Sequence, residues 1–161
     1  MSDKWFVRNL RDMEWWKRGS GGWVTEIVDG DQPVGVNLFM LEAGDKMAMY
    51  HWEADQEGFL VLSGEAVLVI DGEERTIRQW DYVHCPPGVP HTRIGAGTGT
   101  CVILGIGARE HQHGPDWGAY PYSEVAMKHD ASTEEETTDP DIAYARFADR
   151  EPAEFSEDWL H

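Results

Sequence analysis

Two histidines and two glutamates in this sequence have types and spacing suited to holding a metal ion. His51, Glu53 and Glu57 lie close together, and His91 follows the rigid segment Pro86-Pro87-Gly88-Val89-Pro90. On a strand, His51 and Glu53 would point to one face, and Glu57 can start the neighbouring strand and return to that face. Two neutral imidazoles and a carboxylate suit Fe, Mn, Co, Ni or Zn and leave positions open for water or substrate. The pattern therefore predicts a metal centre open to Lewis-acid or oxygen chemistry.

Glu53 and Arg93 are the candidates for a role beside that metal. Arg93 lies two residues after His91, so both side chains should share the inward face of one strand. Its guanidinium could orient an acidic group of a substrate, or it could sit at a barrel rim, paired with one of the many acids. Glu53 shares the face of His51 on the same predicted strand.

The other histidines and the two cysteines carry weaker signals. His111 and His113 have the spacing of a metal pair but lack a third ligand, so an exposed linker explains them and we expect no second metal site. Cys85 and Cys101 lie in separate apolar segments, and we expect buried free thiols.

The elements that position these residues read as short strands. Runs with strand character, bounded by Gly, Asp or Pro, cover 23–28, 34–41, 58–62, 66–70 and 100–106. Asp71-Gly72 predicts a two-residue hairpin because both residues tolerate positive φ. We therefore expect one antiparallel β-barrel or sandwich over residues 23–107, with a short N-terminal extension over 1–22.

Residues 108–161 form an acidic C-terminal extension with signals for one or two short helices. Ser123 could cap a helix over 124–128, and Asp139-Pro140 could begin another that runs to about Phe147. Aromatic residues near the end of the chain predict that this extension docks either on its own barrel or on a second subunit.

The composition limits the partners of the protein. The 161 residues include 13 basic and 30 acidic side chains, a formal charge of −17, which would repel nucleic acids and anionic membranes. The first residues lack the apolar run of a signal peptide, and no stretch has the apolar length of a membrane span, so we expect a cytoplasmic protein. A small molecule is the expected ligand, and the aromatic flanks favour a homodimer.

The two histidine-bearing segments resemble the two sequence motifs of the cupin family. The first motif reads Gly, a spacer, His-x-His, three or four residues, Glu, six residues, Gly, and the second contains Pro-x-Gly, two residues and His. The matching positions are Gly44, His51, Glu57, Gly64, Pro86, Gly88 and His91. Three positions depart from the family pattern: Glu53 replaces a histidine, Trp80 a glycine and Gly95 an asparagine. The resemblance covers roughly residues 35–107.

This resemblance implies an all-β, cupin-type antiparallel barrel, also called a jelly roll or double-stranded β-helix. It implies one divalent ion per chain, of Fe, Mn, Ni or Zn, held by His51, Glu57 and His91, with Glu53 in the remaining ligand position. There Glu53 could bind the metal as a fourth ligand, or it could stand off and hydrogen-bond a ligated water. The expected function is a metal-dependent enzyme of the dioxygenase, isomerase or decarboxylase kind that acts on a small polar substrate, with Glu53 and Arg93 as its catalytic residues. The alternative is a cupin that binds a sugar or another metabolite without catalysis.

Overall fold

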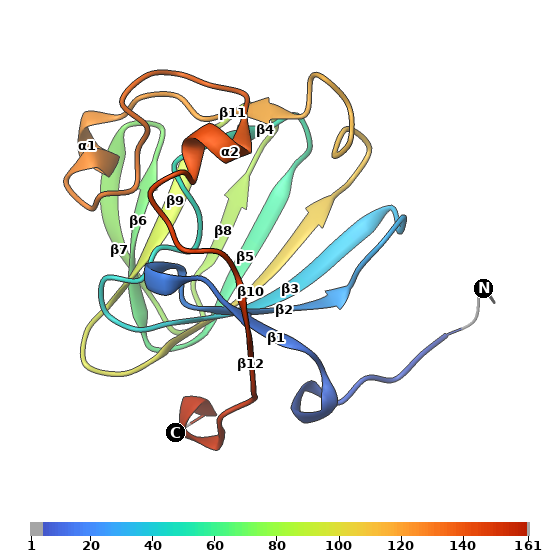
Figure 1. The fold of residues 1–161 in the computed structure, drawn as a ribbon. Helices are drawn as coiled ribbons and strands as arrows, with labels where there is room; N and C mark the ends of the chain where they lie inside the picture. The colour runs from blue at the N-terminus through green and yellow to red at the C-terminus, as the bar shows by residue number, and fades with distance from the viewer. Residues whose placement is uncertain (1–4, 161) are drawn as a thin grey trace.

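Two facing antiparallel sheets form a β-barrel with one open end (Figure 1). The computed structural model describes residues 5–160. The larger sheet has the strand order β12 (Glu151–Ala153), β1 (Trp15–Lys17), β2 (Trp23–Val28), β3 (Val34–Leu41), β10 (Cys101–Ala108), β5 (Glu57–Ser63) and β8 (Tyr82–Cys85). The smaller sheet has the order β7 (Glu73–Arg78), β6 (Glu65–Ile70) and β9 (His91–Ala96), and a short pair joins β11 (Gly118–Ala119) to β4 (Trp52–Glu53). The all-β, cupin-type barrel expected from the sequence is confirmed.

The hairpin between β6 and β7 turns on the two residues that the sequence indicated. Ile70 pairs with Glu73, so Asp71 and Gly72 form the whole connection. Their φ angles are 48° and 77°, the left-handed values that a two-residue turn of this kind needs.

The larger sheet is buried on both faces, which explains its nearly continuous apolar runs. Along β3, Leu41 belongs to the core between the two sheets, together with Phe59 and Ile103. Leu38 and Met40 point to the opposite face, where the two ends of the chain cover them. A strand covered on both sides needs apolar residues at successive positions rather than at alternate ones.

The C-terminal extension docks on its own barrel rather than leaving its aromatic residues free. Strand β12 pairs with β1, and Trp159, in the 3-10 helix Glu157–Leu160, packs against Trp15 at a ring-centroid distance of 4.8 Å. Figure 1 shows the orange-to-red segment running from α2 across the barrel strands before it reaches β12.

Two short helices lie in this extension. Helix α1 (Glu124–Met127) is capped by Ser123, whose hydroxyl accepts a hydrogen bond from the Ala126 backbone. Helix α2 (Pro140–Ala143) begins at Asp139 as expected but ends four residues before Phe147. The following residue, Tyr144, leaves helical geometry, and its hydroxyl accepts a hydrogen bond from the Met49 backbone, which draws the chain onto the barrel. None of the helices among residues 5–160 has the length and apolar character to cross a membrane.

The structure explains one of the departures from the family pattern, Gly95, but not another, Trp80. Trp80 has a φ of 74° in the tight turn before β8, the left-handed region in which glycine is normally favoured, and its side chain is 70% exposed. Gly95 lies so close to the Glu42 backbone that an added Cβ would be 2.1 Å from the carbonyl oxygen. A side chain at position 95 would therefore force β9 and β3 apart.

Candidate metal centre

Three strand beginnings bring His51, Glu57 and His91 together. His51 immediately precedes β4, Glu57 is the first residue of β5, and His91 is the first residue of β9. His51 and His91 pair as an isolated bridge, in which each backbone N–H donates to the other's carbonyl, at 3.2 and 2.8 Å. This pairing places the two imidazole rings side by side, with centroids 5.0 Å apart.

The donor atoms of these three side chains point toward one another. One ligand atom from each of His51, Glu57 and His91 lies within 4.8 Å of the other two. Glu57 Oε2 is 2.9 Å from His91 Nε2 and 4.0 Å from His51 Nε2. Although Glu57 Oε2 and His91 Nε2 are close, they are not oriented for a hydrogen bond. Both atoms are buried and have no hydrogen-bond partner among residues 5–160. Buried polar atoms are rarely left in this state, so the residues present fit a divalent cation.

The other nitrogen of each imidazole is fixed by the backbone. His51 Nδ1 lies 2.7 Å from the Met49 carbonyl oxygen, and His91 Nδ1 lies 2.8 Å from that of Val89. A carbonyl oxygen can only accept, so each Nδ1 carries a proton, and a neutral ring then presents the Nε2 lone pair to the cluster. Histidines that bind metals are commonly held in this way.

Charges around the cluster favour an ionised carboxylate. Burial alone would raise the pKa of Glu57, but His91, His51 and Arg93 together bring that pKa below its usual range. Burial lowers the pKa of His91, and the nearby Arg93 guanidinium lowers it further. Burial also opposes the charged form of His51, yet the carboxylates of Glu53 and Glu57 raise the pKa of His51 above its usual value.

Glu53 lies at the edge of this cluster. Its Oε1 is 3.5 Å from His51 Nε2, and its side chain is 32% exposed. The carboxylate is not among the three donors that lie within 4.8 Å of one another. Of the two roles open to Glu53, this position favours a group that acts on a bound water or substrate.

Arg93 is buried on the inward face of β9, as its spacing from His91 predicted, and it is 1% exposed. Its Cζ lies 3.3 Å from the Phe59 ring centroid, and its Nε donates to Met47 Sδ. Nη1 is buried without a hydrogen-bond partner, and no carboxylate among the described residues lies within 4.0 Å of this guanidinium. The alternative of a rim arginine paired with an acid does not fit this environment.

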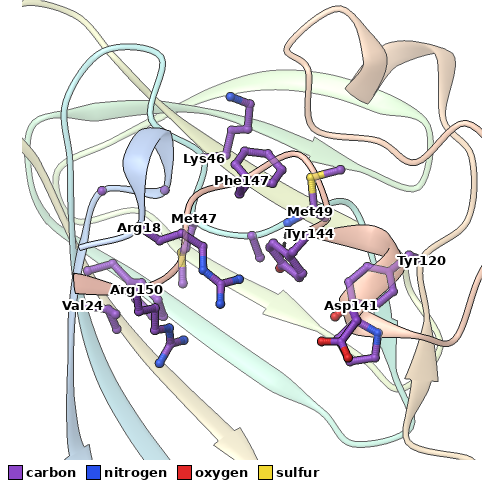
Figure 2. A pocket seen from close by; sticks show the side chains of 15 residues that line it. Arg18, Val24, Lys46, Met47, Met49, Tyr120, Asp141, Tyr144, Phe147 and Arg150 are labelled. Atoms are coloured by element: carbon purple, nitrogen blue, oxygen red, sulfur yellow. Dashed lines mark hydrogen bonds between the residues drawn. The ribbon is translucent and has the colours of Figure 1, made fainter. Parts of the chain in front are cut away.

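A cavity of about 280 Å³ lies beside the cluster, and it is lined by His51, Glu53, Glu57 and Arg93. Its outer wall includes Gln112, Trp117, Tyr120 and Tyr144, which come from the C-terminal extension. This wall was not predicted, because these residues lie in irregular segments that carry no periodic pattern. A second cavity, of about 370 Å³, shares Met47, Tyr120 and Tyr144 with the first (Figure 2).

His111 and His113 do not act as a pair. His111 Nδ1 and its backbone N–H both lie 2.8 Å from the carboxylate of Asp55, and His113 is exposed. Donor atoms of Asp55, Glu110 and His111 lie within 4.8 Å of one another, but Glu110 and His111 are exposed. The hydrogen bonds to Asp55 are sufficient to explain the position of His111.

Comparisons with known proteins agree with this architecture. A family model described as "Cupin domain" matches residues 37–107. A "Putative sugar phosphate isomerase" from Acidithiobacillus ferrooxidans is 29% identical, with a TM-score of 0.50 over 55% of this chain and 61% of that chain. This chain therefore spans about three fifths of that protein's length.

Two further solved structures share the fold. A sugar phosphate isomerase from a cupin superfamily of Silicibacter pomeroyi is 24% identical, with a TM-score of 0.61 over 72% of this chain and 80% of that chain. An RmlC-like cupin from Shewanella frigidimarina is 16% identical, with a TM-score of 0.59 over 70% and 99% of the two chains. A search of curated proteins found no match.

Proposed function

Because this chain is a cupin-domain protein, we propose that its barrel holds a divalent metal ion and isomerises a small polar substrate that carries an acidic group. One observation carries the proposal. His91 Nε2 and Glu57 Oε2 face each other 2.9 Å apart, buried and without hydrogen-bond partners among the described residues, beside a cavity that also contains an unpaired arginine. A metal ion and an acidic ligand would satisfy all three groups.

In this proposal His51, Glu57 and His91 hold the metal, which would supply Lewis-acid polarisation of a substrate oxygen. Glu53 lines the same cavity and is half-buried, so it can take a proton from the hydroxyl-bearing carbon next to a carbonyl and return it to the carbonyl carbon, while the hydroxyl proton passes to the former carbonyl oxygen. Arg93 orients the acidic group of the substrate by a charge-assisted hydrogen bond from Nη1.

Isomerisation is favoured over the other reactions for two reasons. The 29% identical protein from Acidithiobacillus ferrooxidans is described as a sugar phosphate isomerase, which supports this reaction class for a chain with the same barrel. Moving a proton between adjacent carbons also needs a single acid/base and no oxidant, and Glu53 provides that group.

The first test is metal content, measured by plasma mass spectrometry after loading with Fe, Mn, Ni or Zn. We expect about one equivalent per chain in the wild type, loss of the metal in His91→Ala and retention in the control His84→Ala, which changes an exposed histidine on β8. Glu53→Ala should keep its metal but lose activity in an assay of aldose–ketose interconversion. Failure of the wild type to bind any of these metals would refute the proposal.

The same experiment separates catalysis from binding alone. A protein that holds its metal but converts none of a panel of sugar phosphates would be a metal-anchored binding protein instead of an isomerase. The cavity of about 280 Å³ limits either kind of ligand to a small molecule.

A further inference from the structure

Basic side chains gather around the second cavity, although the chain as a whole is strongly acidic. The sequence has 30 acidic and 13 basic residues, yet this cavity of about 370 Å³ is lined by Arg18, Lys46 and Arg150 and by one acidic residue, Asp141. Figure 2 shows Arg18 and Arg150 on the same side of the cavity, with Asp141 across from them. The Lys46 side chain extends away from the two guanidinium groups, so it adds positive potential without direct contact.

The register of the sheet places Arg18 and Arg150 next to each other. In the antiparallel pair of β1 and β12, Trp16 lies opposite Pro152 and Lys17 lies opposite Glu151. The next positions in this register are Arg18 and Arg150, one just after β1 and the other just before β12. Like charges that face each other across an antiparallel pair are destabilising, so this arrangement calls for a negative group between them.

Carboxylates of residues 5–160 provide such a group to only one of these two arginines. Arg8, Arg11 and Arg146 lie 3.2, 2.6 and 2.8 Å from their acidic partners. Arg18, in contrast, has no carboxylate within 4.0 Å among the described residues, and its Nε is buried without a hydrogen-bond partner. Arg150 Nη1 donates to Glu26 Oε1 at 3.5 Å, a long contact between two half-exposed side chains.

We propose that Arg18 and Arg150 form a subsite for a phosphate-type dianion. Two guanidinium groups can bind the oxygens of a tetrahedral dianion in bidentate fashion, whereas a single carboxylate would match only one of them. The ligand is then a phosphorylated small molecule whose other end, with the acidic group that Arg93 would orient, lies in the adjoining cavity beside the metal centre, since Arg150 lines both cavities. Only this placement of the reacting end rests on the proposed function.

Isothermal titration calorimetry of metal-free protein with inorganic phosphate tests the subsite. We expect phosphate to bind the wild type and the control Arg75→Gln with equal affinity. Its affinity for Arg18→Gln and for Arg150→Gln should be at least tenfold lower. Arg75 is an exposed arginine on β7. Acetate should bind the wild type at least tenfold more weakly than phosphate.

Three results would overturn the inference: no binding of phosphate to the wild type, equal binding to wild type and both cavity variants, or equal binding of acetate and phosphate. Thermal melting checks the fold of each variant. If Arg18→Gln fails to fold, Arg150→Gln, which changes an exposed residue, still tests the subsite. Metal content is measured separately. Phosphate binding without metal binding would refute the proposed function alone, and metal binding without phosphate binding would refute the subsite alone.

Discussion

Replacing Arg93 with methionine should make the protein more stable while impairing its ligand site. Arg93 is 1% exposed, and burial lowers its pKa, which means that the fold disfavours the cation. Residues that serve ligand binding often make a protein less stable when no ligand is bound. A methionine at this position would keep apolar contact with Phe59 and Met47 and would remove the buried charge.

The size of the effect follows from two opposing contributions. A buried donor without a partner, such as Nη1, costs about 1–3 kcal/mol. The stacking of the guanidinium on Phe59, at 3.3 Å, offsets up to about 2 kcal/mol of that cost. We therefore expect Arg93→Met to raise the free energy of unfolding by about 1 kcal/mol, which corresponds to about 2–4 °C in Tm for a domain of this size.

Urea denaturation of metal-free wild type, Arg93→Met and the exposed control Arg75→Met measures this difference. The control should change the free energy of unfolding by less than about 0.5 kcal/mol. A loss of more than about 1 kcal/mol in Arg93→Met would show that the protein itself stabilises the guanidinium. The interpretation of Arg93 as a cation awaiting an acidic ligand would then be wrong.

Two further predictions concern the interior of the barrel. Gly95→Ala should lower the free energy of unfolding by about 1–3 kcal/mol or more in chemical denaturation, because its Cβ would overlap a neighbouring backbone; an unchanged midpoint would contradict this packing. Burial raises the pKa of Cys85 to about 11 and that of Cys101 to about 12, so at pH 8 only about one thiol in a thousand or fewer is ionised. Neither thiol should react with a disulfide reagent at pH 8 until the protein is denatured, and rapid reaction of the native protein would argue against their burial.

The barrel was predictable because its signals are local. Short apolar runs bounded by turn residues indicate strands, so β3 covers the range that its sequence predicted, and Asp71 and Gly72 form the expected hairpin. The gathering of His51, Glu57 and His91 was expected because their segments resemble the two cupin motifs, and the structure brings these residues together from different sheets. The positive φ of Trp80 shows the limit of such patterns, because the turn keeps its backbone shape although the residue differs.

The second cavity was not predictable from the sequence. Arg18 and Arg150 are far apart in the chain, and only the register between β1 and β12 brings them together. Strands of three residues carry too little pattern to fix their partners. The early end of α2 has a similar origin, because the hydrogen bond from Met49 to Tyr144 is a tertiary contact that helix signals do not contain.

The candidate metal ligands and the two arginines lie in different parts of the chain, which bears on how such a protein can diversify. The metal-binding candidates all lie within residues 37–107, whereas Arg18 and Arg150 belong to the flanking segments. Substitutions in the flanks can therefore change which molecule is accepted without disturbing the donors that would perform the chemistry. A chimera that joins this barrel to the terminal segments of another member of the fold would be a practical starting point for redesigning its selectivity.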